Sequence, residues 1–114
     1  MAGTNDSNPI GLNLSAVEFS NKVASVASAI DDTIGRQMWA AKPMPTYEEA
    51  DPPSVLDATR NANIELYNAE IDLIVSAHAG TAIGPDFYTN FNDVGLYDDY
   101  LHPNDTGYQV MAEF

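Results

Sequence analysis

A carboxylate and a histidine lie three residues apart near the end of the chain, in the segment Asp99-Tyr100-Leu101-His102-Pro103. At this spacing on one loop, the carboxylate can accept a hydrogen bond from one imidazole N–H, which fixes the tautomer and stabilises the imidazolium. The other ring nitrogen is then free to take a proton from a hydroxyl nucleophile. The pattern indicates that His102 is a catalytic base oriented by Asp99. The alternative is a surface histidine in a turn, beside a solvated aspartate.

A second polar segment, Gly3-Thr4-Asn5-Asp6, lies at the start of the chain. A glycine turn after a strand would present the Asn5 side chain, and an amide placed there can donate a hydrogen bond to a developing oxyanion. Taken alone, the same residues are also typical of an ordinary turn, because Asn and Asp side chains bond readily to their own backbone.

Four aspartates near the end of the chain could offer oxygen ligands to Ca²⁺, but they lack the regular spacing of a calcium-binding loop. Cysteine is absent, which excludes thiolate metal sites and a cysteine nucleophile. We therefore expect no metal and no cofactor. The four residues are Asp93, Asp98, Asp99 and Asp105.

The remaining aromatic and imidazole side chains have simpler interpretations. His78 lies on a helical stripe and is expected to be structural. Trp39 lies in an apolar run and is expected in the core. Tyr97 and Tyr100 flank Asp99, and the sequence leaves open whether they line a substrate groove or pack in the interior.

Two long segments carry apolar residues at helical spacing, 15–34 and 54–79. Gly35 and Gly80 follow them and suit helix C-caps. The expected buried stripes are Phe19, Val23, Val26 and Ile30 in the first helix, and Ile64, Tyr67, Ile71, Ile74 and His78 in the second.

The other segments predict strands, loops and one more helix. The run 37–41 has no polar alternation, which indicates a strand buried on both faces. A proline-rich, acidic loop follows over 42–53. A short strand is expected within 81–88, then a loop over 90–104 and a last helix over 106–114.

This order of helices and strands predicts an α/β fold with a parallel sheet. Two strands are too few for such a sheet, because parallel strands need several neighbours and two covered faces. Gly3 also stands where a strand should just have ended. By organisation alone, the chain is expected to be the second half of a larger domain.

The charge of the chain excludes some partners. It has 4 basic and 17 acidic residues, for a net charge of −13. Such a chain repels phosphate backbones and anionic lipids, so nucleic acid and membrane surfaces are not expected partners. No apolar run approaches the roughly 20 residues of a membrane span. Salt is expected to stabilise the fold by screening the repulsion.

Together and in this order, the two polar segments resemble the motifs of the SGNH (GDSL-type) hydrolases. Gly3-Thr4-Asn5-Asp6 is similar to their Gly-x-Asn-Asp block, and Asp99-x-x-His102-Pro103 to their C-terminal Asp-x-x-His block. The continuation, Asn104-Asp105-x-Gly107-Tyr108-x-x-Met111-Ala112, and the helix around Asn61-x-x-Ile64-x-x-Tyr67 also resemble that family. Within it, the chain is most similar to carbohydrate acetyl esterases.

This resemblance implies a serine ester hydrolase acting on a small acyl ester or an acetylated carbohydrate. Asn5 would supply the oxyanion hole, His102 the general base and Asp99 its orienting carboxylate. The implied fold is a three-layer α/β/α sandwich, flavodoxin-like, with the site at the C-terminal edge of a parallel sheet. The loop 42–53 would form part of the substrate rim. Only the resemblance suggests an extracellular location; the residues themselves leave the compartment open.

The chain departs from the family pattern at the nucleophile. The family's Gly-Asp-Ser block, and the later block that carries a second oxyanion donor, are both missing. Asn5-Asp6-Ser7 echoes the first block, but Ser7 is a weak candidate, because a residue on the oxyanion loop is poorly placed to attack the same carbonyl. We therefore expect residues 1–114 to be the C-terminal portion of one SGNH domain that lacks its N-terminal strands.

The alternative is a non-catalytic half-domain that needs a partner chain or self-association to complete its sheet, because an exposed strand edge favours association. For either reading we expect the isolated chain to be partly unfolded or a homo-oligomer, since a small domain with an incomplete sheet has little stability to spare.

Overall fold

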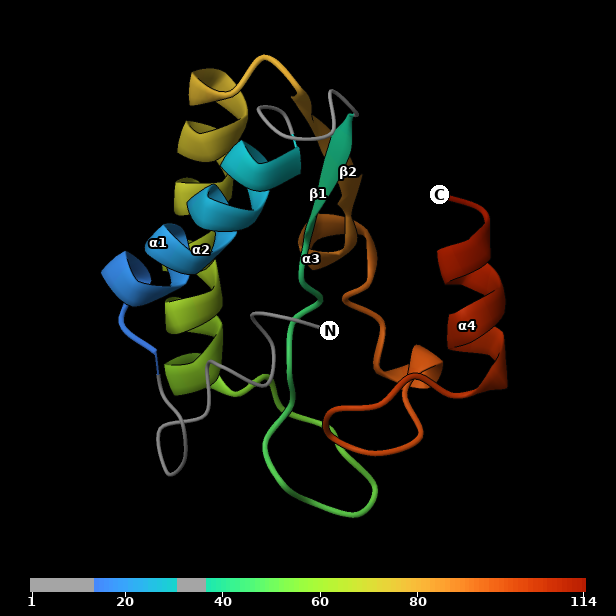
Figure 1. Cartoon of the computed structure of the whole chain (residues 1–114). Coiled ribbons are helices and arrows are strands. Elements are labelled where there is room, and N and C mark those ends of the chain that lie inside the picture. The colour runs from blue at the N-terminus through green and yellow to red at the C-terminus, as the bar shows by residue number, and fades with distance from the viewer. Residues whose placement is uncertain (1–13, 31–36) are drawn as a thin grey trace.

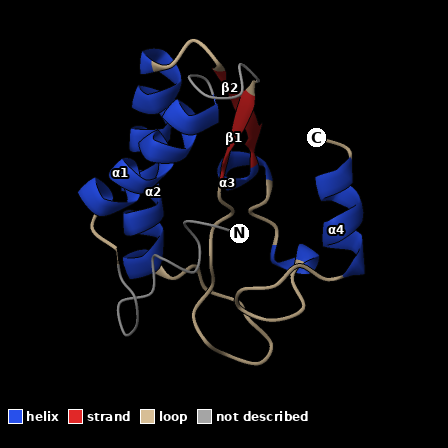
Figure 2. Ribbon diagram, viewed as in Figure 1, coloured by secondary structure: helices blue, strands red, loops and turns tan. Residues whose placement is uncertain are grey.

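The computed structural model describes residues 14–30 and 37–114. Helices and strands alternate through most of this part of the chain, which confirms the predicted α/β class (Figure 1, Figure 2). In order, the elements are α1 (Ala16–Ser28), β1 (Met38–Lys42), α2 (Ala58–Ala77), β2 (Thr81–Asp86), α3 (Phe87–Asn90), the 3₁₀ turn η2 (Val94–Leu96) and α4 (Asp105–Ala112).

Strands β1 and β2 form a parallel pair, and α2 is the crossover helix between them. Met38 lies beside Thr81, Trp39 beside Ala82 and Ala40 beside Ile83. The predicted parallel pairing is confirmed. Over the described residues the sheet has two strands.

Helices α1 and α2 cover one face of this sheet, on the left in Figure 1. The Phe19 ring of α1 stacks on the Tyr67 ring of α2 at 4.3 Å between centroids. Both rings pack with Ile71 and with Ala40 of β1. The first apolar core therefore joins α1, α2 and the strand.

The opposite face of β1 is open, which contradicts the expectation of a strand buried on both faces. Trp39 is 66% exposed, so its predicted place in the core is wrong. Side chains alternate along a strand. Ala40 faces α2, and Lys42 bonds to Asp72 of that helix at 2.9 Å, whereas Trp39 points away from both. An apolar run without polar alternation thus proved to have only one buried face.

The stripe predicted for the first helix is only partly correct. Phe19 is buried and Val23 packs against the same core, as expected. Val26 is exposed, and Ala27 takes the buried place beside it. Valine is larger and more apolar than alanine, so the apolar spacing pointed to Val26 and not to Ala27 as the buried residue. The predicted cap at Gly35 lies outside the described residues.

The stripe predicted for the second helix is confirmed at its four apolar positions, Ile64, Tyr67, Ile71 and Ile74. His78 is half-buried and forms the helix C-cap, consistent with a structural role. The helix begins at Ala58, later than expected, because the Asp57 carboxylate accepts a hydrogen bond from the Arg60 N–H at 2.9 Å.

A second apolar core lies under the loops that follow the strands. It consists of Met44, Tyr47, Phe91 and Tyr97, with side chains of α3 and α4 packed around it. The Tyr97 ring meets the edges of two other rings, Tyr47 at 4.9 Å and Phe91 at 5.4 Å between centroids. This core carries the segment in which the candidate catalytic residues lie.

Helix α4 lies against this core at a glycine. A Cβ placed on Gly107 would lie 2.2 Å from the Leu96 carbonyl oxygen and 2.9 Å from both Phe91 Cζ and Pro103 Cβ. Real Cβ atoms do not approach other atoms so closely, so the helix can only dock here without a side chain. Gly107 therefore sets the distance between α4 and the loop before it.

We predict that Gly107→Ala destabilises the protein by about 2 kcal/mol or more, because the added methyl must displace backbone rather than a flexible side chain. The free energy of unfolding in urea measures the effect. Gly95→Ala is the control, since its Cβ would meet the Asp93 side chain at 3.2 Å. Equal losses for the two variants would contradict the close docking of α4.

Candidate active site

The residues from Tyr97 to Asn104 form a narrow hairpin between η2 and α4. Tyr97 and Pro103 make an antiparallel bridge. The Asp98 N–H donates to the His102 carbonyl at 2.8 Å, and the Asn104 N–H donates to the Leu96 carbonyl at 2.9 Å. Asp99 and His102 stand at the closed end of this hairpin, so its backbone bonds fix their separation.

Hydrogen bonds from the Asn104 side chain stabilise the base of the hairpin. Its amide N–H groups donate to the Gly95 carbonyl at 2.8 Å and the Tyr97 carbonyl at 3.2 Å. Its oxygen accepts from the Gly107 N–H at 2.9 Å and thereby caps α4. One side chain thus ties the hairpin to the helix that follows it.

The two tyrosines beside Asp99 have different roles. The Tyr97 hydroxyl lies 2.8 Å from the Pro45 carbonyl and 3.0 Å from the Phe91 carbonyl, and burial raises its pKa, helped by Tyr47. Tyr97 is therefore a packing residue. Tyr100 lies under the Arg60 guanidinium, 5.4 Å from the ring centroid, and lines a groove. Tyr97 therefore packs in the interior, and Tyr100 lines a groove; that a substrate occupies this groove stays a prediction.

The Asp99 carboxylate makes the contact that the spacing predicted. Its Oδ2 lies 2.9 Å from Nδ1 of His102. Its Oδ1 accepts from the backbone N–H groups of Leu101 and His102, both at 2.7 Å. With both oxygens engaged, the carboxylate cannot turn away from the imidazole without losing backbone hydrogen bonds as well.

These contacts change the acidity of Asp99. Partial burial acts to raise its pKa, but the hydrogen bonds from the His102 ring and from the backbone of Leu101 and His102 outweigh it, and the pKa is lowered overall. The carboxylate therefore stays charged in mildly acidic solution. A charged acceptor at Nδ1 favours the tautomer in which that nitrogen holds the proton.

The other ring nitrogen of His102, Nε2, is not engaged by Asp99. The His102 side chain is 65% exposed, and no described residue makes a hydrogen bond to Nε2. The ring borders a groove of about 520 Å³. The lining consists of Asp98, His102, Pro103, Asn104, Asp105, Thr106 and Tyr108. A base with one nitrogen fixed and the other open can accept a proton there.

A neighbouring groove of about 430 Å³ lies between the hairpin and the acidic loop. Glu49, Ala50, Asp51 and Pro53 line it from the loop side, and Asp98, Asp99 and Tyr100 from the hairpin side. Asp98 lines both grooves. The loop is held in place by the Tyr47 N–H, which donates to the Tyr100 carbonyl at 3.0 Å, and by the Asn61 side chain, which bonds to both backbone groups of Thr46.

The structure brings together only part of the predicted constellation. Asp99 and His102 are in contact, whereas Asn5 and Ser7 lie outside the described residues. No serine lines either groove among the residues that are described, and Thr106 and Tyr108 carry the hydroxyl groups in the described lining of the His102 groove. The sequence suggested Asp98 only as a possible calcium ligand, and Asn104 and Tyr108 only as part of the family resemblance. Their places in this groove, next to the Asp-x-x-His segment, were not predicted.

The described residues hold no group of three or more His, Asp or Glu side chains arranged to bind a metal ion. None of the described helices is long and apolar enough to cross a membrane.

Comparisons of the chain with models of protein families, with curated proteins and with solved structures gave no match.

We predict that Asp99→Asn lowers stability in a pH-dependent manner. A lowered pKa in the folded state means that the charged carboxylate stabilises the fold above its ordinary value of 3.8, and that this contribution is lost as the pH falls through the lowered folded value. The free energy of unfolding in urea should be higher for the wild type than for the variant at about pH 5. At about pH 2 the two free energies should no longer differ. A difference that stays constant across this range would contradict the charged contact.

Proposed function

We propose that the chain is the base-bearing part of a serine ester hydrolase of the SGNH type. The observation that carries the proposal is the Asp99–His102 contact at 2.9 Å, with the rest of the exposed imidazole bordering a groove. This is the geometry that a general base requires, because one nitrogen is oriented and the other faces the place where a substrate can bind.

In the proposed reaction, Nε2 of His102 takes the proton of a serine hydroxyl as the oxygen attacks the ester carbonyl. The Asn5 amide stabilises the oxyanion, and the imidazolium returns the proton to the departing alcohol. Water then releases the acid from the acyl-serine by the same steps. Asp99 stabilises the imidazolium and keeps the ring in place.

The proposed nucleophile is not among the side chains that line the described grooves. Ser7 is the only serine in the undescribed segments, and it remains the weak candidate within the chain. The Asp99–His102 pair can also activate water directly, so some hydrolysis is expected even where no serine attacks.

We also propose the finer fold, a three-layer α/β/α sandwich of which residues 1–114 form the C-terminal portion. Two features support it. Helices α1 and α2 cover one face of the parallel pair, and α4 lies on the opposite side of the strands in Figure 1. The exposed Trp39 face is where a further part of the second helical layer would pack.

The same open face favours a second candidate function, a non-catalytic half-domain completed by a partner chain or by self-association. Trp39 on this face is mostly exposed, and each described strand has a single neighbour. Unpaired strand edges and exposed apolar side chains promote association.

We predict that the chain hydrolyses p-nitrophenyl acetate faster than buffer and that His102→Ala lowers this excess rate at least about tenfold, since a positioned base typically contributes 10²–10⁴-fold. His78→Ala is the matched control, because this histidine caps α2 and lies in neither groove. Ser7→Ala then tests whether that serine is the nucleophile.

Two outcomes would overturn the esterase proposal: a wild-type rate equal to buffer, or equal rates for the wild type and His102→Ala. A dimer in light scattering that becomes a monomer on Trp39→Ser would then favour the half-domain.

A further inference from the structure

We propose that the grooves beside His102 select esters whose alcohol part carries a positive charge, such as an ammonium group, with Asp98 and Asp105 as the specificity-determining residues. This inference rests on the proposed esterase function and adds a substrate class to it. It is carried by the charge of the groove walls and by an aromatic side chain among them.

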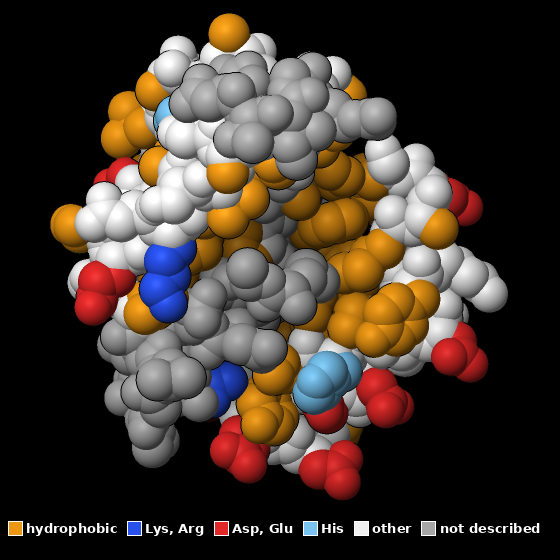
Figure 3. Space-filling view, in the orientation of Figure 1, with side chains coloured by type: hydrophobic (Ala, Val, Ile, Leu, Met, Phe, Trp, Pro, Cys, Tyr) orange, Lys and Arg blue, Asp and Glu red, His pale blue; other side chains and the backbone are white. Residues whose placement is uncertain are grey.

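The walls of the two grooves carry negative charge with little compensation. Asp98 lines both grooves and is fixed beside His102, because its N–H donates to the His102 carbonyl at 2.8 Å. Asp105 stands on the other wall, at the start of α4. Glu49 and Asp51 face the hairpin from the acidic loop. Figure 3 shows acidic side chains gathered beside a histidine on the lower part of the molecule.

No described lysine or arginine lines either groove. The nearby Arg60 is already engaged, since its Nε lies 3.5 Å from Asp57 Oδ2 and its guanidinium stacks on Tyr100. Its side chain is only 12% exposed. The field in the grooves is therefore set by carboxylates, and a concave wall of one sign concentrates ions of the opposite sign.

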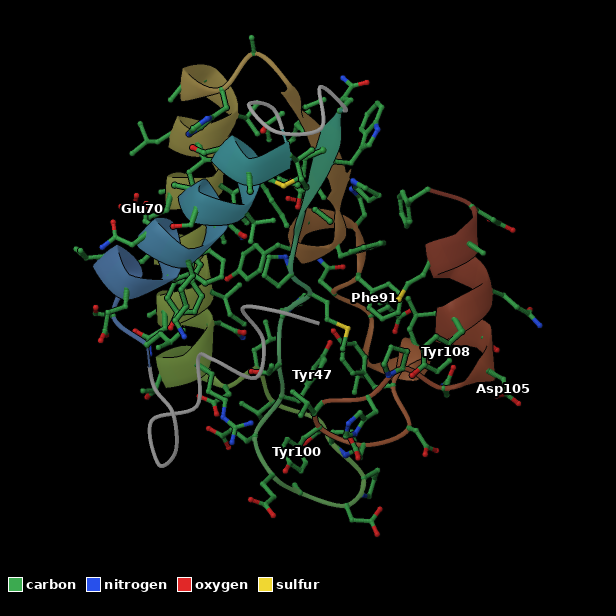
Figure 4. The ribbon with its side chains drawn as sticks, viewed as in Figure 1. Tyr47, Glu70, Phe91, Tyr100, Asp105 and Tyr108 are labelled. Carbon is green, nitrogen blue, oxygen red and sulfur yellow. The ribbon has the colours of Figure 1, made fainter. Side chains whose placement is uncertain are left out.

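An aromatic ring adds a second attraction for a cation. Tyr108 is 57% exposed and lines the His102 groove. The Tyr100 ring beside the neighbouring groove already carries the Arg60 guanidinium on one face, so Tyr108 is the ring that this inference uses. Figure 4 shows Tyr108 and Asp105 on α4 and Tyr100 on the hairpin. Glu70 lies on α2, on the other side of the molecule in this view. The face of a tyrosine ring attracts ammonium groups, whereas a neutral alcohol gains only contact area and an anion is repelled.

Binding of choline tests this selectivity without any need for turnover. The full chain is titrated with choline and with its neutral isostere 3,3-dimethylbutanol, and the His102 ring signals are followed by NMR. We expect choline to bind about tenfold more tightly, and each of Asp98→Asn and Asp105→Asn to weaken it roughly threefold, as expected for a unit charge some 7 Å away in water.

Glu70→Gln removes the same charge far from the grooves and should leave choline binding unchanged. Added salt should weaken choline binding and not that of the isostere. Equal affinities for the two compounds, or an effect of Glu70→Gln as large as that of Asp98→Asn, would overturn the selectivity.

Hydrolysis distinguishes this inference from the function on which it rests. Acetylthiocholine and its neutral isostere, 3,3-dimethylbutyl thioacetate, are compared by kcat/KM, with His102→Ala beside the wild type. Hydrolysis that depends on His102 without preference for the cation overturns the selectivity and leaves the esterase proposal standing. Selective choline binding without such hydrolysis overturns the esterase proposal and supports a cation-selective groove.

Discussion

The candidate site depends on the side chain of Asn104, which joins three parts of the backbone at once. It holds the carbonyls of Gly95 and Tyr97 on one side and caps α4 through the Gly107 N–H on the other. The helix can come this close only because residue 107 has no side chain. Without this junction the hairpin would not be closed at its base, and the backbone N–H groups that orient the Asp99 carboxylate would lose their fixed place.

The parts of the site that the sequence could predict are local. Asp99 and His102 are three residues apart on one turn, so their contact depends on few other residues and follows from spacing alone. The buried stripe of α2 was predictable for a similar reason, because Ile64, Tyr67, Ile71 and Ile74 repeat with the period of a helix. The N-cap of α4 lies in the same stretch as the motif.

The parts that could not be predicted depend on what packs against a segment. The apolar run that contains Trp39 does not show whether one or two layers will cover it. Ala27 is buried where Val26 was expected, because the side of α1 that meets its neighbours is decided by packing and not by the spacing of the larger apolar residues. The acidic loop is held beside the hairpin by hydrogen bonds between residues far apart in the sequence. The Tyr47 N–H donates to the Tyr100 carbonyl, and the Asn61 side chain bonds to the backbone of Thr46. Such contacts leave no periodic signal.

The central claim is that Asp99 holds His102 as a base with its proton on Nδ1 and with Nε2 open to the groove. Nitrogen-15 NMR of the His102 ring at a pH where it is neutral tests this claim most directly, since the two tautomers give different nitrogen shifts. We predict the Nδ1–H tautomer in the wild type and its loss in Asp99→Asn. An Nε2–H tautomer in the wild type, unchanged by Asp99→Asn, would contradict the account.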